Sequence, residues 1–290
     1  MKILLLGKYG QVAWELQRAL APLGEVVAVG RAELDFADAG AVRALTGAVR
    51  PQLLVNAAAY TMVDQAETEQ ELCVKINATL PEILAAEARK LGAWLIHYST
   101  DYVFDGAKTT PYVETDPTRP LGVYGAAKLA GERAVGASGA DYLLFRVCWV
   151  YGARGRNFMQ TMRRLARERE KVRVVRDQFG SPTWARMIAG ASALAAQQVM
   201  RTTERQRFRG IYHLAAGGVA SWHEFARQII EGMPATERKC REVESITSAE
   251  YPTPVKRPAY SVLNCDKLEK IFGLRLPHWE HGLQQVLDPS

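Results

Sequence analysis

Short apolar runs alternate with longer amphipathic stretches through the first half of the chain. The apolar runs predict buried strands, and the amphipathic stretches between them predict helices. The strands are expected at residues 2–6, 25–30, 52–55, 94–97 and 142–147, and the helices at residues 10–21, 38–49, 79–90 and 124–135. Strand–helix alternation at this spacing is typical of a parallel, doubly wound sheet of the α/β class.

The pattern is less regular after residue 150. Helices are expected at residues 158–170, 186–199, 222–230 and 266–271, with a short strand at 172–175 and Pro-rich loops between them. We therefore expect residues 1–150 to form a dinucleotide-binding domain. Residues 151–290 are expected to form mainly a smaller substrate-binding lobe, with some segments returning to the first domain. Ligands of such sheets bind outside the carboxyl ends of the strands, so the lobe is expected at that edge.

The composition is that of a globular protein, with 48% hydrophobic and 23% charged residues. The apolar run at the N-terminus is too short for a signal peptide, and no run approaches the roughly 20 residues of a membrane helix. The four cysteines, which are far apart and form no CxxC pair, are Cys73, Cys148, Cys240 and Cys265. These features predict a cytoplasmic protein with reduced thiols and no membrane partner.

The net charge is +6, which is compatible with nucleic acid or with small anionic ligands. The densest group of arginines, at residues 163–169, is interleaved with Glu168 and followed by Glu170 on an expected helix. This pattern favours a solvated helix face over a nucleic-acid patch. No nucleic-acid partner is expected.

A glycine-rich segment follows the first expected strand. Gly7, Gly10 and Ala13 have the spacing G-x-x-G-x-x-A, a variant of the dinucleotide fingerprint. Gly7 would permit the tight turn, Gly10 would let the backbone approach a pyrophosphate, and Ala13 would allow close helix–strand packing. In this position, between a strand and an amphipathic helix, the segment predicts a Rossmann-type fold.

The second expected strand ends at Gly30-Arg31. Sites that prefer NAD place an acid here for the ribose hydroxyls, whereas an arginine suits a 2′-phosphate. Arg31 therefore favours NADPH, with NADH still usable, although a solvent-facing loop arginine is an alternative interpretation. Asp35 and Phe36 could flank the adenine.

Tyr124 and Lys128 are four residues apart in an expected helix, which places both side chains on one face. Hydride addition to a carbonyl leaves an alkoxide that needs a proton, and a phenol whose pKa is lowered by a nearby lysine ammonium can donate it. Thr100, after the fourth expected strand, could hydrogen-bond the same oxygen. On spacing alone, a Tyr and a Lys four residues apart are more often an ordinary surface pair, and Ser99-Thr100 could be simple turn residues. The order of Thr100, Tyr124 and Lys128 at a strand end and a helix start instead favours a reductase.

The chain resembles the extended short-chain dehydrogenase/reductase family, and within it the members that reduce nucleotide-linked keto-sugars. The resemblance covers nearly the whole chain. It rests on residues 7–13, 55–67, 99–106 (STDYVFDG), 124–132 (YGAAKLAGE), 146–152 (RVCWVYG), 157–162, 174–183, 210–218 and 257–268. It implies a Rossmann fold with a substrate lobe.

The resemblance also implies roles for residues. Tyr124 would be the proton donor, with Lys128 as its partner and ribose ligand. The cofactor would further contact Gln11 and Val12 at the pyrophosphate and Ala59, Tyr60 and Thr61 on the nicotinamide side. The substrate would contact Thr100 and Asp101 at the sugar ring, Trp149 at the hexose and Arg257 towards the nucleotide end.

The reaction implied is reduction of the 4-keto group of dTDP-4-dehydro-L-rhamnose to dTDP-L-rhamnose by NAD(P)H, with this dTDP-linked keto-sugar as the partner. Related dehydratases have an acid after the Thr-Asp pair, and this chain has Tyr102 there. Two alternatives remain: a nucleotide-sugar 4-epimerase with tightly bound NAD, and a non-catalytic NADP-binding regulatory homologue. The chain has no obvious acidic cluster, so no metal is expected, and a homodimer remains open.

Overall fold

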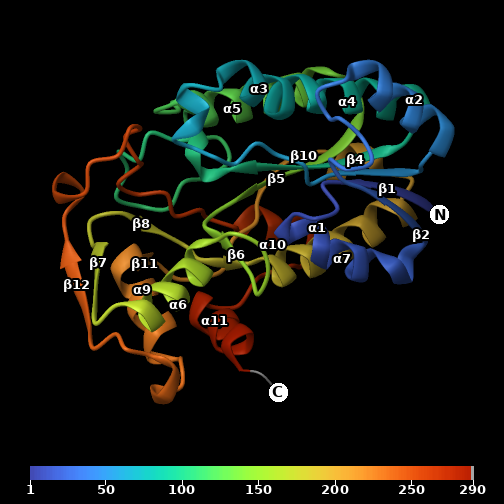
Figure 1. Ribbon diagram of the computed structural model, residues 1–290. Helices are drawn as coiled ribbons and strands as arrows, with labels where there is room; N and C mark the ends of the chain where they lie inside the picture. The colour runs from blue at the N-terminus through green and yellow to red at the C-terminus, as the bar shows by residue number, and fades with distance from the viewer. Residues whose placement is uncertain (289–290) are drawn as a thin grey trace.

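A computed structural model describes residues 1–288, and its centre is a six-stranded sheet (Figure 1). All neighbouring strands are parallel, in the order β10-β5-β4-β3-β1-β2. The strands are β1 (Lys2–Leu6), β2 (Glu25–Val29), β3 (Leu53–Asn56), β4 (Trp94–Thr100), β5 (Asp141–Val147) and β10 (Gly210–His213). The expected α/β class and doubly wound parallel sheet are confirmed.

Helices cover both faces of the sheet, which explains why its strands are apolar throughout. One face is covered by α1 (Gln11–Leu20), α7 (Ala185–Arg201) and α10 (Asp266–Phe272), and the other by α2 (Ala39–Val49), α3 (Gln70–Val74), α4 (Leu80–Leu91) and α5 (Val123–Ala137). Successive residues of β1 alternate between two hydrophobic cores: Ile3 and Leu5 belong to one, and Leu4 and Leu6 to the other.

In the central sheet, two differences from the strand predictions exceed a shift of one residue at an end. The fourth strand, expected to end at residue 97, continues to Thr100 because it pairs with β5 over its full length. The sixth strand, β10, was not predicted. Its four residues are too few to give a periodic pattern, and they form a strand by pairing with β5.

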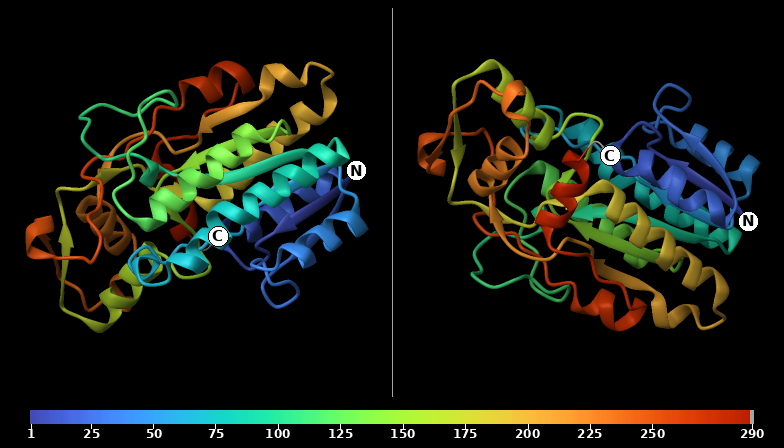
Figure 2. Two further views of the ribbon diagram at one scale, coloured as in Figure 1. Left: turned by 90° about the horizontal axis from the view of Figure 1, so that it is seen from above. Right: turned by 90° about the horizontal axis from the view of Figure 1, so that it is seen from below.

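A second group of elements lies beyond the carboxyl ends of the central strands (Figures 1 and 2). Its helices are α6 (Phe158–Glu168), α9 (Trp222–Glu231) and α11 (Trp279–Leu287), whereas the short helix α8 (Arg205–Phe208) lies beside β5 of the central sheet. Its short strands are β6 (Val150–Tyr151), β7 (Lys171–Val175), β8 (Phe179–Gly180), β9 (Thr183–Trp184), β11 (Ala220–Ser221) and β12 (Glu242–Ile246). A third core, which includes Tyr151, Phe225 and Trp279, holds this group together.

The four cysteines are all unpaired in the structure. Within residues 1–288, no helix combines the length and the apolar character needed to cross a membrane.

Candidate active site

The turn after β1 requires glycine at its first position. Gly7 has φ +94°, and a Cβ there would lie 2.7 Å from the backbone of Ala57. The Gly7 and Lys8 amides both donate to the Val29 carbonyl, at 2.9 and 3.0 Å. The turn is therefore held between the ends of β2 and β3, and only a residue without a side chain fits.

The N-terminus of α1 is open to an anion. Gly10 is its N-cap, no side chain caps it, and no acid occupies the first turn. Its free N–H groups therefore suit a phosphate. The Gln11 side chain is already engaged, since its Oε1 accepts from Asn157 Nδ2 at 2.8 Å, and Val12 packs against a core. These two positions offer their backbone rather than their side chains.

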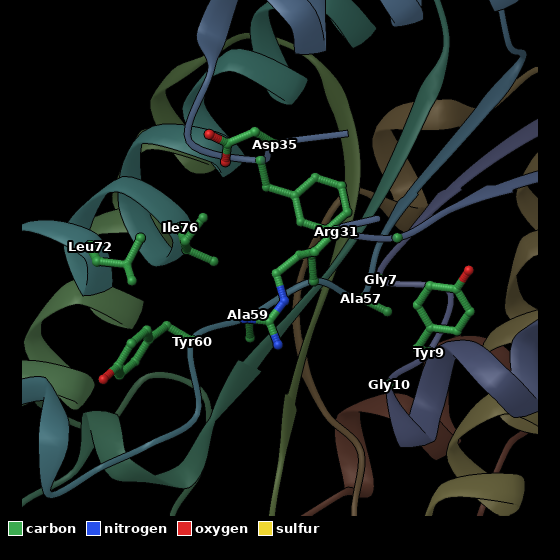
Figure 3. Close-up of a pocket in the computed structure, with 13 residues that line it drawn as sticks. Gly7, Tyr9, Gly10, Arg31, Asp35, Ala57, Ala59, Tyr60, Leu72 and Ile76 are labelled. Atoms are coloured by element: carbon green, nitrogen blue, oxygen red, sulfur yellow. The ribbon is translucent and has the colours of Figure 1, made fainter. Parts of the chain in front are cut away.

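A cavity of about 280 Å³ lies beside this turn (Figure 3). Its lining comes from the carboxyl ends of β1, β2 and β3 and from α3: Gly7, Tyr9, Gly10, Gly30, Arg31, Asp35, Phe36, Ala57, Ala58, Ala59, Tyr60, Leu72 and Ile76. The cavity brings together seven of the expected cofactor residues. The other five, Gln11, Val12, Thr61, Tyr124 and Lys128, do not line it. The Arg31 side chain extends across its middle (Figure 3).

Asn77 supports this cavity, and sequence reasoning missed it. The side chain is fully buried, accepts from the Tyr60 amide at 3.0 Å and donates to the Tyr60 carbonyl at 2.9 Å. It belongs to a π-helical turn, Lys75–Thr79, and such turns occur frequently at functional sites. A buried Asn in an apolar helix was the signal that could have identified it.

Thr100 and Tyr124 meet at the carboxyl end of β4. Thr100 is the last residue of the strand, and Tyr124 lies in the first turn of α5. Burial raises the pKa of the Tyr124 phenol, and a hydrogen bond with Thr100 partly offsets that rise in pKa. Tyr60, which lines the cavity, and Tyr124 pack against the same small cluster of Ala66, Cys73 and Ala127. The cavity and the phenol are therefore adjacent.

Lys128 lies one turn further along α5 and is 2% exposed. Burial lowers the pKa of its ammonium to about 8, and the nearby Glu132 opposes this shift. The Nζ atom donates to the Tyr98 carbonyl at 2.5 Å. From their spacing on the helix, Lys128 was expected to lower the pKa of Tyr124. In the structure the pKa of Tyr124 is raised, because burial outweighs any attraction from an ammonium turned towards Tyr98.

Asp101 is turned into the interior behind Thr100. It is 2% exposed, accepts from Thr100 Oγ1 at 3.1 Å, and receives the Cys148 thiol at 3.4 Å. Burial raises the pKa of this carboxyl to about 6, and hydrogen bonds from Ser261, Cys148 and Thr100 limit the rise. Direct contact between Asp101 and a sugar stays a prediction; its present contacts are with the groups behind Thr100.

Trp149 is held in an unusual conformation. Its φ of +44° lies in the left-handed region, which a bulky residue rarely adopts. Its ring stacks on Trp222 with centroids 3.5 Å apart and planes 5° apart, and it also covers Gly180. Strain of this kind is concentrated at functional sites. Packing of Trp149 against a hexose stays a prediction.

Arg257 comes from the C-terminal part of the chain. Its Nη2 donates to Asp64 Oδ1 at 2.8 Å, and its guanidinium lies 6.0 Å from the ring centre of Tyr102. The Tyr102 ring in turn meets Tyr124 edge-on. Arg257 Nη1 is buried without a hydrogen-bond partner, which leaves a donor beside the predicted catalytic residues.

The glycine turn, the open helix N-terminus and the Thr100–Tyr124–Lys128 arrangement at the next strand end define an NAD(P)-dependent oxidoreductase of the extended short-chain dehydrogenase/reductase type. Comparisons with known proteins agree. A model of the RmlD substrate binding domain matches residues 1–290. A dTDP-4-dehydrorhamnose reductase from Burkholderia thailandensis is 45% identical over 288 residues, with 98% of this chain and 97% of that protein covered. The chain therefore belongs to the dTDP-4-dehydrorhamnose reductase family.

Two solved structures of this family are similar over their full extent. A dTDP-4-dehydrorhamnose reductase from Clostridium acetobutylicum has a TM-score of 0.90 and 36% identity, with 99% of each chain covered. One from Bacillus anthracis, solved in complex with NADP, has a TM-score of 0.88 and 33% identity, with 98% of each chain covered. The resemblance inferred from the sequence is confirmed.

Proposed function

We propose that this protein reduces the 4-keto group of dTDP-4-dehydro-L-rhamnose to give dTDP-L-rhamnose in the cytoplasm, with NADPH as hydride donor and NADH as a second one. The observation that carries the proposal is the position of Thr100, at the end of β4, and Tyr124, in the first turn of α5, next to a glycine-lined cavity. This chain is also 45% identical to the dTDP-4-dehydrorhamnose reductase from Burkholderia thailandensis.

The cavity fits a dinucleotide. A Cβ at Gly7 would clash with the backbone of Ala57, just after β3, and the uncapped N-terminus of α1 offers N–H groups to a pyrophosphate. Arg31 would pair with the 2′-phosphate, and Asp35 and Phe36 would flank the adenine. The nicotinamide side would be formed by Ala59, Tyr60 and Thr61, with Tyr124 and Lys128 at the ribose. NADPH supplies the hydride when bound.

Tyr124 supplies the proton. Its hydroxyl would donate to the C4 oxygen as that oxygen becomes an alkoxide, which leaves a phenolate. The raised pKa of Tyr124 keeps the phenol protonated before the reaction, so the donor is ready. Thr100 would hydrogen-bond the same oxygen, and the Lys128 ammonium would stabilise the phenolate that forms.

The sugar nucleotide would lie between the sheet and the second group of elements. Trp149 would pack against the hexose. Asp101 would interact with the sugar ring, either directly or through its hydrogen bond with Thr100. The unpartnered Nη1 of Arg257 would meet a diphosphate oxygen. All of these groups come from one chain, so the chemistry is compatible with a monomer or a homodimer.

The test is NADPH oxidation by the purified protein with dTDP-4-dehydro-L-rhamnose, beside the UDP analogue. We expect turnover with both and a preference for the dTDP sugar of about 10–200-fold, the value of one methyl group in a pocket. A 4-epimerase would instead release NAD on denaturation and interconvert sugars without consuming NADPH. A regulatory homologue would bind NADP and consume none. Either result would overturn the proposal.

A further inference from the structure

A carboxylate that the sequence pattern did not reveal lies at the carboxyl end of β2. Glu33 Oε2 accepts from the Gly30 amide at 2.9 Å, so the side chain folds back over the last turn of the strand. Glu33 Oε1 accepts from Lys8 Nζ at 3.0 Å and from the Tyr9 hydroxyl at 2.6 Å. Three donors from two segments therefore converge on one acid.

This cluster borders the cofactor cavity. The Gly7 and Lys8 amides both bond to Val29, the last residue of β2, so the glycine turn and the strand end are joined. The Tyr9 ring covers Gly30, where a Cβ would lie 2.5 Å from it. Tyr9 and Gly30 both line the cavity. In Rossmann folds an acid at this strand end accepts the ribose hydroxyls of NAD.

One acid, Glu33, and two cations, Lys8 and Arg31, lie at the end of β2. The Lys8 and Tyr9 hydrogen bonds lower the pKa of Glu33 to about 2, and Glu33 raises the pKa of Lys8. Glu33 and Lys8 are therefore both charged near neutral pH. Among the residues that the structure describes, none forms an ion pair with Arg31, which lies at the same strand end.

We infer that Glu33, Lys8 and Tyr9 form a hydrogen-bonded cluster whose partners change with the cofactor, so that both NADH and NADPH can bind; this inference rests on the proposed function. We call this cluster the selector. For NADH, Glu33 accepts the 2′-hydroxyl while Lys8 and Tyr9 keep their bonds to it. For NADPH, Lys8 leaves Glu33 and pairs with the 2′-phosphate together with Arg31.

The hydrogen-bond inventory allows the first state. Each carboxylate oxygen has two lone pairs, and Oε2 is used only by the Gly30 amide. One acceptor position therefore remains for a ribose hydroxyl. The exposure of the ion pair allows the second state, since the Lys8 and Glu33 side chains are 34% and 37% exposed. An ion pair this open contributes little to stability, so Lys8 can change partners at small cost.

The experiment measures the Kd of NADPH and of NADH for the full-length protein by isothermal titration calorimetry, without the sugar. Glu33→Gln keeps the shape and an acceptor for Gly30 but removes the charge. We expect it to tighten NADPH binding and weaken NADH binding, each by about 3–10-fold, so that the ratio shifts by about 10–100-fold. Lys8→Met should weaken NADPH by about 3–10-fold and leave NADH within about twofold.

Two matched controls make the same changes at the opposite ends of these strands. Glu25→Gln and Lys2→Met lie at the amino ends of β2 and β1 and are exposed. Both should leave the two Kd values unchanged. Melting temperatures of all four variants check that the turn at residues 30–34 has not unfolded.

The outcomes separate the selector from the function. If the unmodified protein binds neither dinucleotide, the proposed function and the selector both fail. If the protein binds and turns over both, but Glu33→Gln changes the two Kd values by the same factor, Glu33 only holds its turn. In that case the selector is wrong and the proposed function stands.

Discussion

Lys128 Nζ donates a hydrogen bond to the carbonyl of Tyr98, and Tyr98 precedes Thr100 by two residues on the same strand. The strand therefore holds the lysine with its backbone and places its last side chain, Thr100, next to Tyr124. Tyr124 and Lys128 are one turn apart on α5. One strand and one helix fix all three predicted catalytic groups, and loop motion cannot separate them.

The first prediction concerns the buried charge of Lys128. Its pKa falls from an ordinary 10.5 to about 8 in the folded protein. The unfolded chain therefore binds the proton more tightly, and the free energy of unfolding rises as pH increases from about 8 to 10.5. Lys128→Met removes the buried ammonium. We expect it to raise the melting temperature at pH 7, to abolish the rise in stability above pH 8, and to weaken NADPH binding.

Thermal denaturation between pH 7 and pH 10 and NADPH titration measure these effects. Lys90→Met is the control, because the Lys90 side chain on α4 is exposed, whereas that of Lys128 is buried. A Lys128→Met protein that is less stable than the parent at pH 7 would show that the hydrogen bond to Tyr98 outweighs the cost of burial.

Much of the central fold can be predicted from the sequence because β1 to β5 are apolar runs bounded by turns. The pattern carries less information where pairing decides the structure. β10 has four residues and becomes a strand only against β5. The fourth strand reaches Thr100 because residues 98–100 pair with β5, although Ser99 and Thr100 have turn-like side chains.

In the predicted site, too, some residues can be found from the sequence and others cannot. Gly7, Gly10, Tyr124 and Lys128 have fixed spacings along the chain, so their pattern can be seen in the sequence. Glu33 and Asn77 have no such spacing; each acts through a side chain that reaches across to another segment. Contacts of that kind exist only once the chain is folded.

The second prediction concerns Asn77. Asn77→Ala leaves the Tyr60 amide and carbonyl unsatisfied in the interior, at a cost of about 1–3 kcal/mol. Because Tyr60 lines the cavity, the affinity for NADPH should fall as well. Ser192→Ala is the control, since it frees the buried Tyr98 hydroxyl between β4 and α7 and leaves the cavity intact. Calorimetric titration should show weaker NADPH binding for Asn77→Ala only; equal affinities would limit Asn77 to stability.

The third prediction concerns the strained backbone of Trp149. Glycine adopts a φ of +44° without strain, whereas alanine does not. Trp149→Gly should therefore unfold at a higher temperature than Trp149→Ala, the reverse of the usual order. Both should raise the KM for the keto-sugar and leave the Kd of NADPH unchanged. Thermal unfolding and steady-state kinetics measure the two effects. Normal KM values would show that the stack with Trp222 serves only the packing of the lobe.

The last prediction concerns the proton donor. Tyr124→Phe removes one hydroxyl and keeps the ring that packs against Tyr102 and the cluster around Cys73. Folding and NADPH binding should survive, and kcat should fall by about 10²–10⁴-fold, the usual contribution of a general acid. Thr100→Val removes one hydrogen bond of about 1 kcal/mol and leaves the donor, so kcat should fall by about tenfold or less.

The matched control is Tyr102→Phe, because the Tyr102 ring lies beside that of Tyr124. It tests whether the loss of any tyrosine hydroxyl in this region slows the reaction. We expect kcat to remain within about twofold of the parent, since Thr100 and Tyr124, and not Tyr102, are proposed to meet the C4 oxygen. Single-turnover reduction with NADPH bound separates the chemical step from product release. If Tyr124→Phe reduces the keto-sugar as fast as the parent while Tyr102→Phe does not, the proton comes from Tyr102, and the role proposed for Tyr124 is wrong.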